Sequence, residues 1–383
     1  MYEIEKAGGE EIREVERRQQ QIDEDDDRKN LLVDNFGRIA NKLRISVTDK
    51  CNMRCMYCMP RGKVSWFSEH NILDYHEIAR LVSILADLGI ERIRLTGGEP
   101  LLRPNLENLI LALAKIEGIK SISMTTNGIL FGEKARALKD AGLESVNISL
   151  DTFSPARFKE ITGTKSFNKV IESINTAERV GLNVKINTVI IRGWNDSEIV
   201  DFANFARVTG RIVRFIEFMP LDGSGIWQSN LVYTKREMID LITRSLGGLI
   251  PLNNTPNSDL DDTNDMNHKN NSIKYYNQNH KSDPATLFSF CDGRGIVGFI
   301  PSMSEPFCAS CDRMRLTSDG RLLTCLFEKT GYDLKSILRS GKPDYYLKKK
   351  ITENVMKKPE GIIKIIKTNA LKSSLNLMHT IGG

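Results

Sequence analysis

Short β-rich runs alternate with longer amphipathic runs along the chain from about residue 42. The β-rich runs stand at 43–49, 92–96, 121–126, 145–151, 183–191 and 211–219. The stretches between them carry apolar residues at helical spacing, as at Ile78, Leu81, Val82 and Leu85. Further helices are expected near 106–116, 133–141, 167–180 and 196–208. A strand followed by a helix, repeated six times, predicts βαβ units and a parallel sheet of the α/β class.

Polar residues occupy one face of several predicted strands. They fall at alternate positions: Arg44, Ser46 and Thr48 in the first, Arg92, Arg94 and Thr96 in the second, Lys185 and Asn187 in the fifth. A parallel strand covered by helices on both faces is apolar on both faces. A closed small barrel also fills its interior with branched apolar side chains. We therefore expect a partial (β/α)6 TIM-type barrel whose open interior holds a polar ligand.

Changes in composition predict four regions. Residues 1–35 form an acidic extension, and residues 36–250 form the partial barrel. Residues 251–283 form a surface insertion, because the stretch 253–283 holds nine Asn and too few aliphatic residues to build a core. Residues 284–383 form a C-terminal region that carries a second group of cysteines and ends in Gly382-Gly383.

Composition and charge narrow the class of protein. No apolar run approaches the ~20 residues needed to span a bilayer, and the first residues are too charged for a signal peptide. We expect a soluble, cytoplasmic protein that binds no membrane. Residues 1–30 hold eleven acidic and six basic residues, so the net charge of +5 divides into −5 there and +10 elsewhere. The positive remainder suits an anionic ligand, but no dense basic stripe interleaved with aromatic residues indicates nucleic acid.

Cys51, Cys55 and Cys58 lie within eight residues directly after the first predicted strand. A zinc site usually has four ligands, and disulfides need an even number of cysteines. Three thiolates fit three corners of a [4Fe–4S] cluster and leave one iron open, whereas clusters that only transfer electrons usually have four Cys ligands. The alternative is a zinc site completed by a residue elsewhere in the chain.

A second triplet is formed by Cys308, Cys311 and Cys325. Cys291 lies upstream and could complete a four-sulfur zinc site. Arg313 and Arg315 stand between the cysteines. If that stretch is extended, both guanidinium groups point the same way and form a fork for phosphate oxygens. The alternative for the two arginines is ordinary surface charge.

The first triplet, with Tyr57 directly before its last cysteine, resembles the signature of radical S-adenosylmethionine (SAM) enzymes. The TGGEP sequence at 96–100, which follows the second predicted strand, is similar to that superfamily's second motif. The resemblance implies that the open iron binds the methionine moiety of SAM. One electron from the cluster then cleaves the sulfonium and yields a 5′-deoxyadenosyl radical.

Both triplets together resemble the GTP 3′,8-cyclase family, which begins molybdenum cofactor biosynthesis. The matching segments run from about residue 35 to the end: 43–60, 92–103, 125–128, 147–152, 184–187, 214–220, 308–325 and 382–383. In that family the radical takes hydrogen from C3′ of GTP, C3′ attacks C8 of the guanine, and reduction gives 3′,8-cyclo-7,8-dihydro-GTP. The resemblance also implies a homodimer and a downstream cyclic pyranopterin monophosphate synthase.

The resemblance implies a role for each matched residue. The residues expected to contact SAM are Tyr57, Gly98, Glu99, Ser149 and Met219. Contacts to GTP fall to Arg44, Arg94, Thr125, Lys185, Arg313 and Arg315. The residues expected to take part in catalysis are Arg44, Arg214, Gly382 and Gly383. One cluster is held by Cys51, Cys55 and Cys58, and another by Cys308, Cys311 and Cys325, with one iron open to the guanine. Cys291 matches no motif of the family and is expected to be a buried thiol.

The residues also favour GTP without the resemblance. Five cations from four separate places, three of them inward strand faces, suit a polyanionic triphosphate, because buried cations without partners are costly. Two other functions fit part of the pattern. A peptide-modifying radical maturase usually has more C-terminal cysteines. A zinc-stabilised nucleic-acid-binding protein would be colourless and would bind RNA in a salt-sensitive way.

Overall fold

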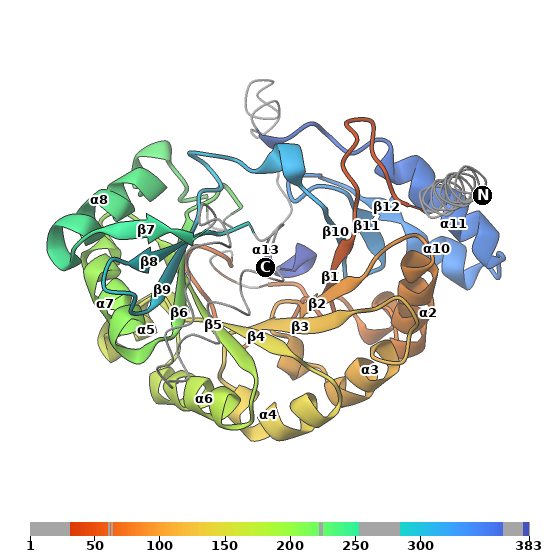
Figure 1. Ribbon diagram of the computed structural model, residues 1–383. Helices are drawn as coiled ribbons and strands as arrows, with labels where there is room; N and C mark the ends of the chain where they lie inside the picture. The colour runs from red at the N-terminus through yellow and green to blue at the C-terminus, as the bar shows by residue number, and fades with distance from the viewer. Residues whose placement is uncertain are drawn as a thin grey trace, which may run out of the picture.

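The computed structural model describes residues 31–59, 62, 64–221, 225–252, 284–362 and 378–382. Most of the acidic extension, the Asn-rich insertion at 253–283 and Gly383 lie outside the described residues. Within them the strands form a twelve-stranded sheet in the order β12-β11-β10-β1-β2-β3-β4-β5-β6-β9-β8-β7. Figure 1 shows this sheet curving into an arc with its helices on the outer, convex side.

Six parallel strands form the centre of the sheet. They are β1 (Lys42–Ser46), β2 (Arg92–Thr96), β3 (Ser121–Thr126), β4 (Ser145–Ser149), β5 (Asn183–Ile190) and β6 (Ile212–Glu217). Each pairs in parallel with the next along the chain. The predicted parallel sheet is therefore confirmed. Several predicted strands extended too far at their carboxyl ends, where Asp151 and Met219 instead lie in loops and line a cavity.

The helices cover the convex face of these strands. Those predicted are α2 (Tyr75–Ala86), α3 (Leu106–Leu113), α4 (Phe131–Asp140), α6 (Phe167–Arg179) and α7 (Ile199–Thr209). Two more, α5 (Pro155–Thr162) and α8 (Lys235–Leu246), were not predicted. Their start signals are present in the sequence: Ser154 caps α5 ahead of Pro155, and Thr234 with Glu237 forms a capping box on α8.

The last third of the chain extends the sheet at both ends. Strands β8 (Thr286–Phe290) and β9 (Ile296–Ile300) join β7 (Leu249–Pro251) beside β6. Strands β10 (Arg313–Leu316), β11 (Arg321–Leu323) and β12 (Tyr332–Asp333) join beside β1. Because β9 and β10 pair in parallel with β6 and β1, the C-terminal region continues the partial barrel at both of its open edges.

Three helices follow these strands in the part of the chain that the structure describes. Helices α10 (Leu334–Arg339) and α11 (Asp344–Val355) lie outside the sheet, and α11 contacts α2. Helix α13 (Met378–Ile381) lies inside the arc near its centre, where the C-terminal end of the chain is marked (Figure 1). Among the helices that the structure describes, none is both long and apolar enough to cross a membrane.

The core fills the space between the sheet and its helices. Leu43 and Ile45 of β1 are fully buried there, against the stripe of α2 that includes Leu81 and Leu85. Because successive side chains of a strand point to opposite faces, Arg44 faces the concave interior instead. The hydrophobic effect that fixes the helices on one face thus also aims the polar residues at the other.

Candidate active site

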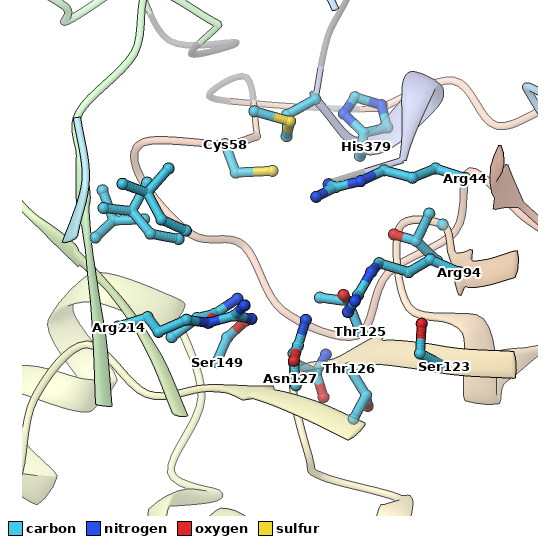
Figure 2. Close-up of a pocket in the computed structure, with 18 of the residues that line it drawn as sticks. Arg44, Cys58, Arg94, Ser123, Thr125, Thr126, Asn127, Ser149, Arg214 and His379 are labelled. Carbon is cyan, nitrogen blue, oxygen red and sulfur yellow. The ribbon is translucent and has the colours of Figure 1, made fainter. Parts of the chain in front are cut away.

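A cavity of about 380 Å³ lies on the concave side of the sheet. Alternate residues of the parallel strands line it, including Arg44, Arg94, Ser123, Thr125, Ser149, Lys185, Asn187 and Arg214. In Figure 2, Arg94 and Arg214 extend toward this space from opposite sides, with Thr125 and Ser149 below them and Cys58 above. The prediction of a polar interior is confirmed.

The first cysteine triplet lies in the loop that follows β1, and all three cysteines line this cavity. Arg54 ties the loop together, because its guanidinium donates to the carbonyl oxygens of Cys51 (2.7 Å) and Met53 (2.8 Å). The amide of Cys58 donates to the carbonyl oxygen of Cys55 at 2.9 Å. The loop thus presents three sulfurs to one side.

The thiols of this triplet are unfavourable as free thiolates. Burial raises the pKa of Cys51 to about 11 and that of Cys58 to about 12, and it raises the pKa of Cys55 well above its usual value. Bare thiolates are therefore unfavourable here unless a cation binds them. In the described part of the chain, no three His, Cys, Asp or Glu side chains could hold a single metal ion. A four-iron cluster requires a wider arrangement, because each thiolate binds a different iron.

The second triplet lines an adjoining cavity of about 90 Å³. Met219, Ser302, Phe307, Arg313, Arg315 and Leu326 line both cavities. Burial raises the pKa of the Cys325 thiol. Burial acts the same way on Cys311, but the charges of Arg313 and Lys358 outweigh it and hold the Cys311 pKa below its ordinary value. The two triplets therefore face adjoining spaces, and Arg313 and Arg315 line both of them.

A group of arginines crowds the wall near β1 and β10. Arg44 and Arg315 occupy paired positions on these strands. Burial, followed by the charges of Arg315 and Arg94, holds the pKa of Arg44 well below its ordinary value. Burial and the charge of Arg313 lower the pKa of Arg315 to about 10. Mutually repelling cations on one wall form a site that an anion stabilises.

Most residues that the resemblance assigns to SAM line the larger cavity. Tyr57 does so, and its hydroxyl donates to Asp151 Oδ2 at 2.5 Å. Gly98 packs against the loop, where a Cβ would overlap the carbonyl oxygens of Asp49 and Lys50. Ser149 and Met219 also line the cavity. These four residues are brought together, and their contacts to SAM stay predictions.

Glu99 is not brought into the cavity with them. Its side chain is fully buried and accepts hydrogen bonds from Thr126 Oγ1 (2.7 Å) and from the amides of Asn127 (2.8 Å) and Leu101 (3.1 Å). Burial raises its pKa to about 7. The carboxylate therefore joins the turn after β2 to the end of β3, which positions the neighbouring residues that do line the cavity.

The C-terminal segment enters the site from inside the arc. Arg315 donates a hydrogen bond to the carbonyl oxygen of Gly382 and a longer one of 3.4 Å to that of Ile381. His379 is buried, lines the cavity near Cys58 (Figure 2), and packs edge-on against Trp66 with ring centroids 5.7 Å apart. Gly383 lies outside the described residues. The matched motifs did not include His379 or Trp66.

The prediction that Cys291 is a buried thiol is wrong. Cys291 is exposed, and it lies in the turn between β8 and β9. Its amide donates to the carbonyl oxygen of Gly248 at 3.1 Å, so backbone pairing at the end of the hairpin fixes its place. It lines neither cavity, and so it is not placed to complete the second cysteine group.

Comparison with known proteins identifies the family to which this chain belongs. Residues 45–206 match the Radical SAM superfamily, and residues 253–363 match Molybdenum Cofactor Synthesis C. A GTP 3′,8-cyclase from Thermodesulfovibrio yellowstonii is 40% identical over 354 residues, which cover 92% of this chain and 100% of that protein. The chain belongs to the GTP 3′,8-cyclase family.

Other relatives of this GTP 3′,8-cyclase family member agree. A protein of Arabidopsis thaliana, named GTP 3′,8-cyclase, mitochondrial, is 40% identical over 342 residues, covering 88% of this chain and 81% of that protein. Among solved structures, Streptococcus suis SuiB bound to the precursor peptide SuiA aligns with a TM-score of 0.52 and 16% identity, covering 89% of this chain and 75% of that one. The likeness to SuiB shows the fold alone.

Proposed function

We propose that this protein converts GTP to (8S)-3′,8-cyclo-7,8-dihydroguanosine 5′-triphosphate, a lyase reaction that is the first step of molybdenum cofactor biosynthesis. One observation carries the proposal: two cysteine triplets border adjoining cavities, and Arg313 and Arg315 line both. A nucleotide held by this arginine pair reaches both triplets, which neither a structural zinc protein nor a simple electron carrier requires.

The protein's own residues would hold the two cofactors. Cys51, Cys55 and Cys58 would hold one [4Fe–4S] cluster, and Cys308, Cys311 and Cys325 a second. Tyr57, Gly98, Ser149 and Met219 would surround SAM. When bound, the first cluster and SAM supply the radical that starts the cyclisation at C3′ of GTP, and the protein binds and orients the reactants.

Binding of the triphosphate falls to Arg44, Arg94, Lys185, Arg313 and Arg315. Their mutual repulsion is relieved when an anion enters, and guanidinium groups match phosphate oxygens in pairs. The triphosphate does not react, so its binding energy serves to fix the ribose and base against the radical source. Arg214, which donates to Asn187 Oδ1 at 2.9 Å, stands on the opposite wall and would orient the reacting end.

The enclosed position of the site protects the reaction. Helix α13 lies inside the arc (Figure 1), where the carbonyl oxygens of Ile381 and Gly382 accept hydrogen bonds from Arg315. A radical in contact with solvent or loose side chains is quenched, so enclosure favours cyclisation over side reactions. The part in catalysis that we assign to Gly382 is to fit beside Arg315 with the least bulk, and the part assigned to Gly383 stays a prediction.

Anaerobic incubation of the iron-loaded protein with GTP, SAM and dithionite tests the proposal. We expect the cyclic product, together with methionine and 5′-deoxyadenosine. Cys55→Ala should abolish SAM cleavage, and Cys311→Ala should abolish cyclisation. Cys291→Ala is the matched control and should keep full activity, because Cys291 is exposed and lines neither cavity. A colourless, zinc-bound protein that leaves GTP unchanged would reject the proposal.

A further inference from the structure

Lys358 is a buried cation beside the second cysteine triplet. It is 4% exposed and lines the same cavity of about 90 Å³ as the three cysteines. Its ammonium donates to the carbonyl oxygens of Cys311 at 2.7 Å and of Arg313 at 3.2 Å. Lys358 therefore holds the backbone at the point where the ligand loop becomes β10, and so fixes the direction of both the Cys311 sulfur and the Arg313 side chain.

The charge of Lys358 is not balanced by a carboxylate among the residues that the structure describes. Two acids beside this cavity pair elsewhere: Asp34 binds Arg38, which lines the cavity, at 2.6 Å, and Asp312, which follows Cys311, binds Lys42 at 3.0 Å. Carbonyl oxygens satisfy the hydrogen bonds of an ammonium but leave its net charge in place. A buried charge without a counter-charge is strongly unfavourable. Among the described residues that line this cavity, the groups that can become negative are the thiols of Cys308, Cys311 and Cys325.

A second buried cation, Arg38, holds the segment next to Lys358, and its charge is neutralised. Arg38, neutralised by Asp34, donates to the carbonyl oxygens of Cys308 (2.8 Å), Pro359 (2.8 Å) and Glu360 (2.9 Å). At Gly361 a Cβ would lie 2.5 Å from the Cβ of Cys308, so the backbone approaches the loop closely. Residues 358–362 thus form a wall fitted to the loop, and within it Lys358 supplies the unbalanced charge.

We propose that Lys358 is a positioning residue for the second cluster, which it serves in two ways. It holds the backbone of Cys311, and its charge offsets the negative charge of the cluster with its three thiolates. This proposal for Lys358 rests on the proposed function in one respect: it requires that Cys308, Cys311 and Cys325 hold a cluster. A nearby positive charge stabilises the reduced, more negative form of a cluster, so Lys358 raises the reduction potential of this one.

Stability measured with and without iron gives the sharpest test. Lys358→Met keeps the length and apolar stem of the side chain and removes its charge. In the iron-loaded protein we expect this variant to melt at a lower temperature than the wild type. In the iron-free protein we expect it to melt at the same or a higher temperature, because the unbalanced charge is gone. Lys357→Met is the matched control: it removes the same charge at the exposed neighbouring position and should leave both temperatures unchanged.

A purely structural role predicts a different pattern. If Lys358 mattered only through its hydrogen bonds to the backbone, Lys358→Met would destabilise the iron-free and the loaded proteins alike. That outcome would overturn the assignment, as would a variant that fails to fold even without iron. Lys358→Arg keeps the charge and is expected to retain the stability that loading confers.

Redox titration followed by electron paramagnetic resonance gives an independent readout. The loaded wild type should hold about eight iron atoms per chain and show two cluster signals. In Lys358→Met we expect one signal to move to a more negative potential, or to be lost with about half of the iron, while the other stays in place. Lys358→Arg should restore the potential. Two unchanged signals in Lys358→Met would refute the proposal for this residue and leave the proposed function intact. If the wild type bound no iron, both the proposal for Lys358 and the proposed function would be refuted.

Discussion

Arg315 donates a hydrogen bond from its guanidinium to the carbonyl oxygen of Gly382, which joins β10 to the last residue that the structure describes. Gly382 adopts φ +81°, a conformation that favours glycine, and a Cβ there would lie 2.6 Å from Thr96 Cγ2. Gly382 is therefore packed between Arg315 and Thr96 of β2, and its fit depends on the absence of a side chain.

Gly382→Ala is expected to abolish cyclisation while both clusters stay assembled. The added methyl group meets Thr96 and strains the backbone, so the segment cannot keep its place beside Arg315. Iron content and product formation measure the two effects separately. Gly341→Ala is the matched control, because Gly341 has a similar φ of +72° and open space around it. Full activity in Gly382→Ala would contradict the packing described here.

Arg44→Met should weaken GTP binding and stabilise the nucleotide-free protein. Loss of one charge-assisted contact to phosphate weakens binding by roughly ten- to a hundredfold. Relief of repulsion from Arg94 and Arg315 should raise the melting temperature of the free protein, since these charges lower the Arg44 pKa. Calorimetric titration with GTP and thermal melting provide the measurements. Arg136→Met, on an exposed helix surface, is the control and should change neither GTP affinity nor melting temperature. If Arg44→Met bound GTP as tightly as the wild type, Arg44 would not belong to an anion site.

Tyr57→Phe should destabilise the first cluster loop. It removes the 2.5 Å hydrogen bond to Asp151, a buried carboxyl whose pKa burial raises to about 6. Leaving a buried acceptor unpaired costs about 1–3 kcal/mol. We expect a lower melting temperature and weaker SAM binding in the loaded protein. Tyr345→Phe, at a largely exposed site, should behave as the wild type; a Tyr57→Phe protein with unchanged stability would show that the bond contributes nothing.

The ion pair between Glu77 and Arg339 should make stability depend on acid pH. Arg339 donates to both carboxylate oxygens, at 2.6 and 3.0 Å, and thereby holds the Glu77 pKa below its ordinary value of 4.5. A carboxyl with a lowered pKa stabilises the fold above pH 4.5 and loses this contribution as pH falls through its lowered pKa. Glu77→Gln should therefore cost about 1 kcal/mol at pH 7 and progressively less below pH 4.5.

Urea unfolding of the iron-free chain between pH 3 and pH 8 would measure this difference. Glu353→Gln serves as the comparison: Glu353 pairs with Lys350 at a more exposed site, so its contribution should change with pH in the same direction but by less. If the free energy of unfolding of wild type and Glu77→Gln differed by the same amount at every pH, the ion pair with Arg339 would not be the cause of the difference.

Local patterns predicted the barrel strands and the place of the first cysteine triplet directly after β1, because these depend on neighbours in the sequence. Alternation of polar and apolar residues was enough to place Arg44, Arg94 and Lys185 on the concave face. Contacts between distant segments were not predictable in this way. The parallel pairing of β10 with β1 and the wall formed by Lys358 join residues that local periodicity does not relate.

The positions of Glu99 and Cys291 also differ from what the sequence predicted. The motif placed Glu99 at the cofactor, yet three donors draw its carboxylate into the turn between β2 and β3. Cys291 was expected inside the protein, yet the β8–β9 hairpin ends there and leaves it in solvent. In both cases hydrogen bonding of the surrounding backbone decides the position, and residue type alone does not reveal it.

The most direct test of the proposed activity follows one hydrogen atom. Iron-loaded protein would be incubated anaerobically with SAM, dithionite and GTP that carries deuterium at C3′ of the ribose. If the site holds the ribose against the radical source, mass spectrometry will find deuterium in 5′-deoxyadenosine and none retained at C3′ of the cyclic product. Unlabelled 5′-deoxyadenosine, with labelled GTP recovered intact, would contradict the account.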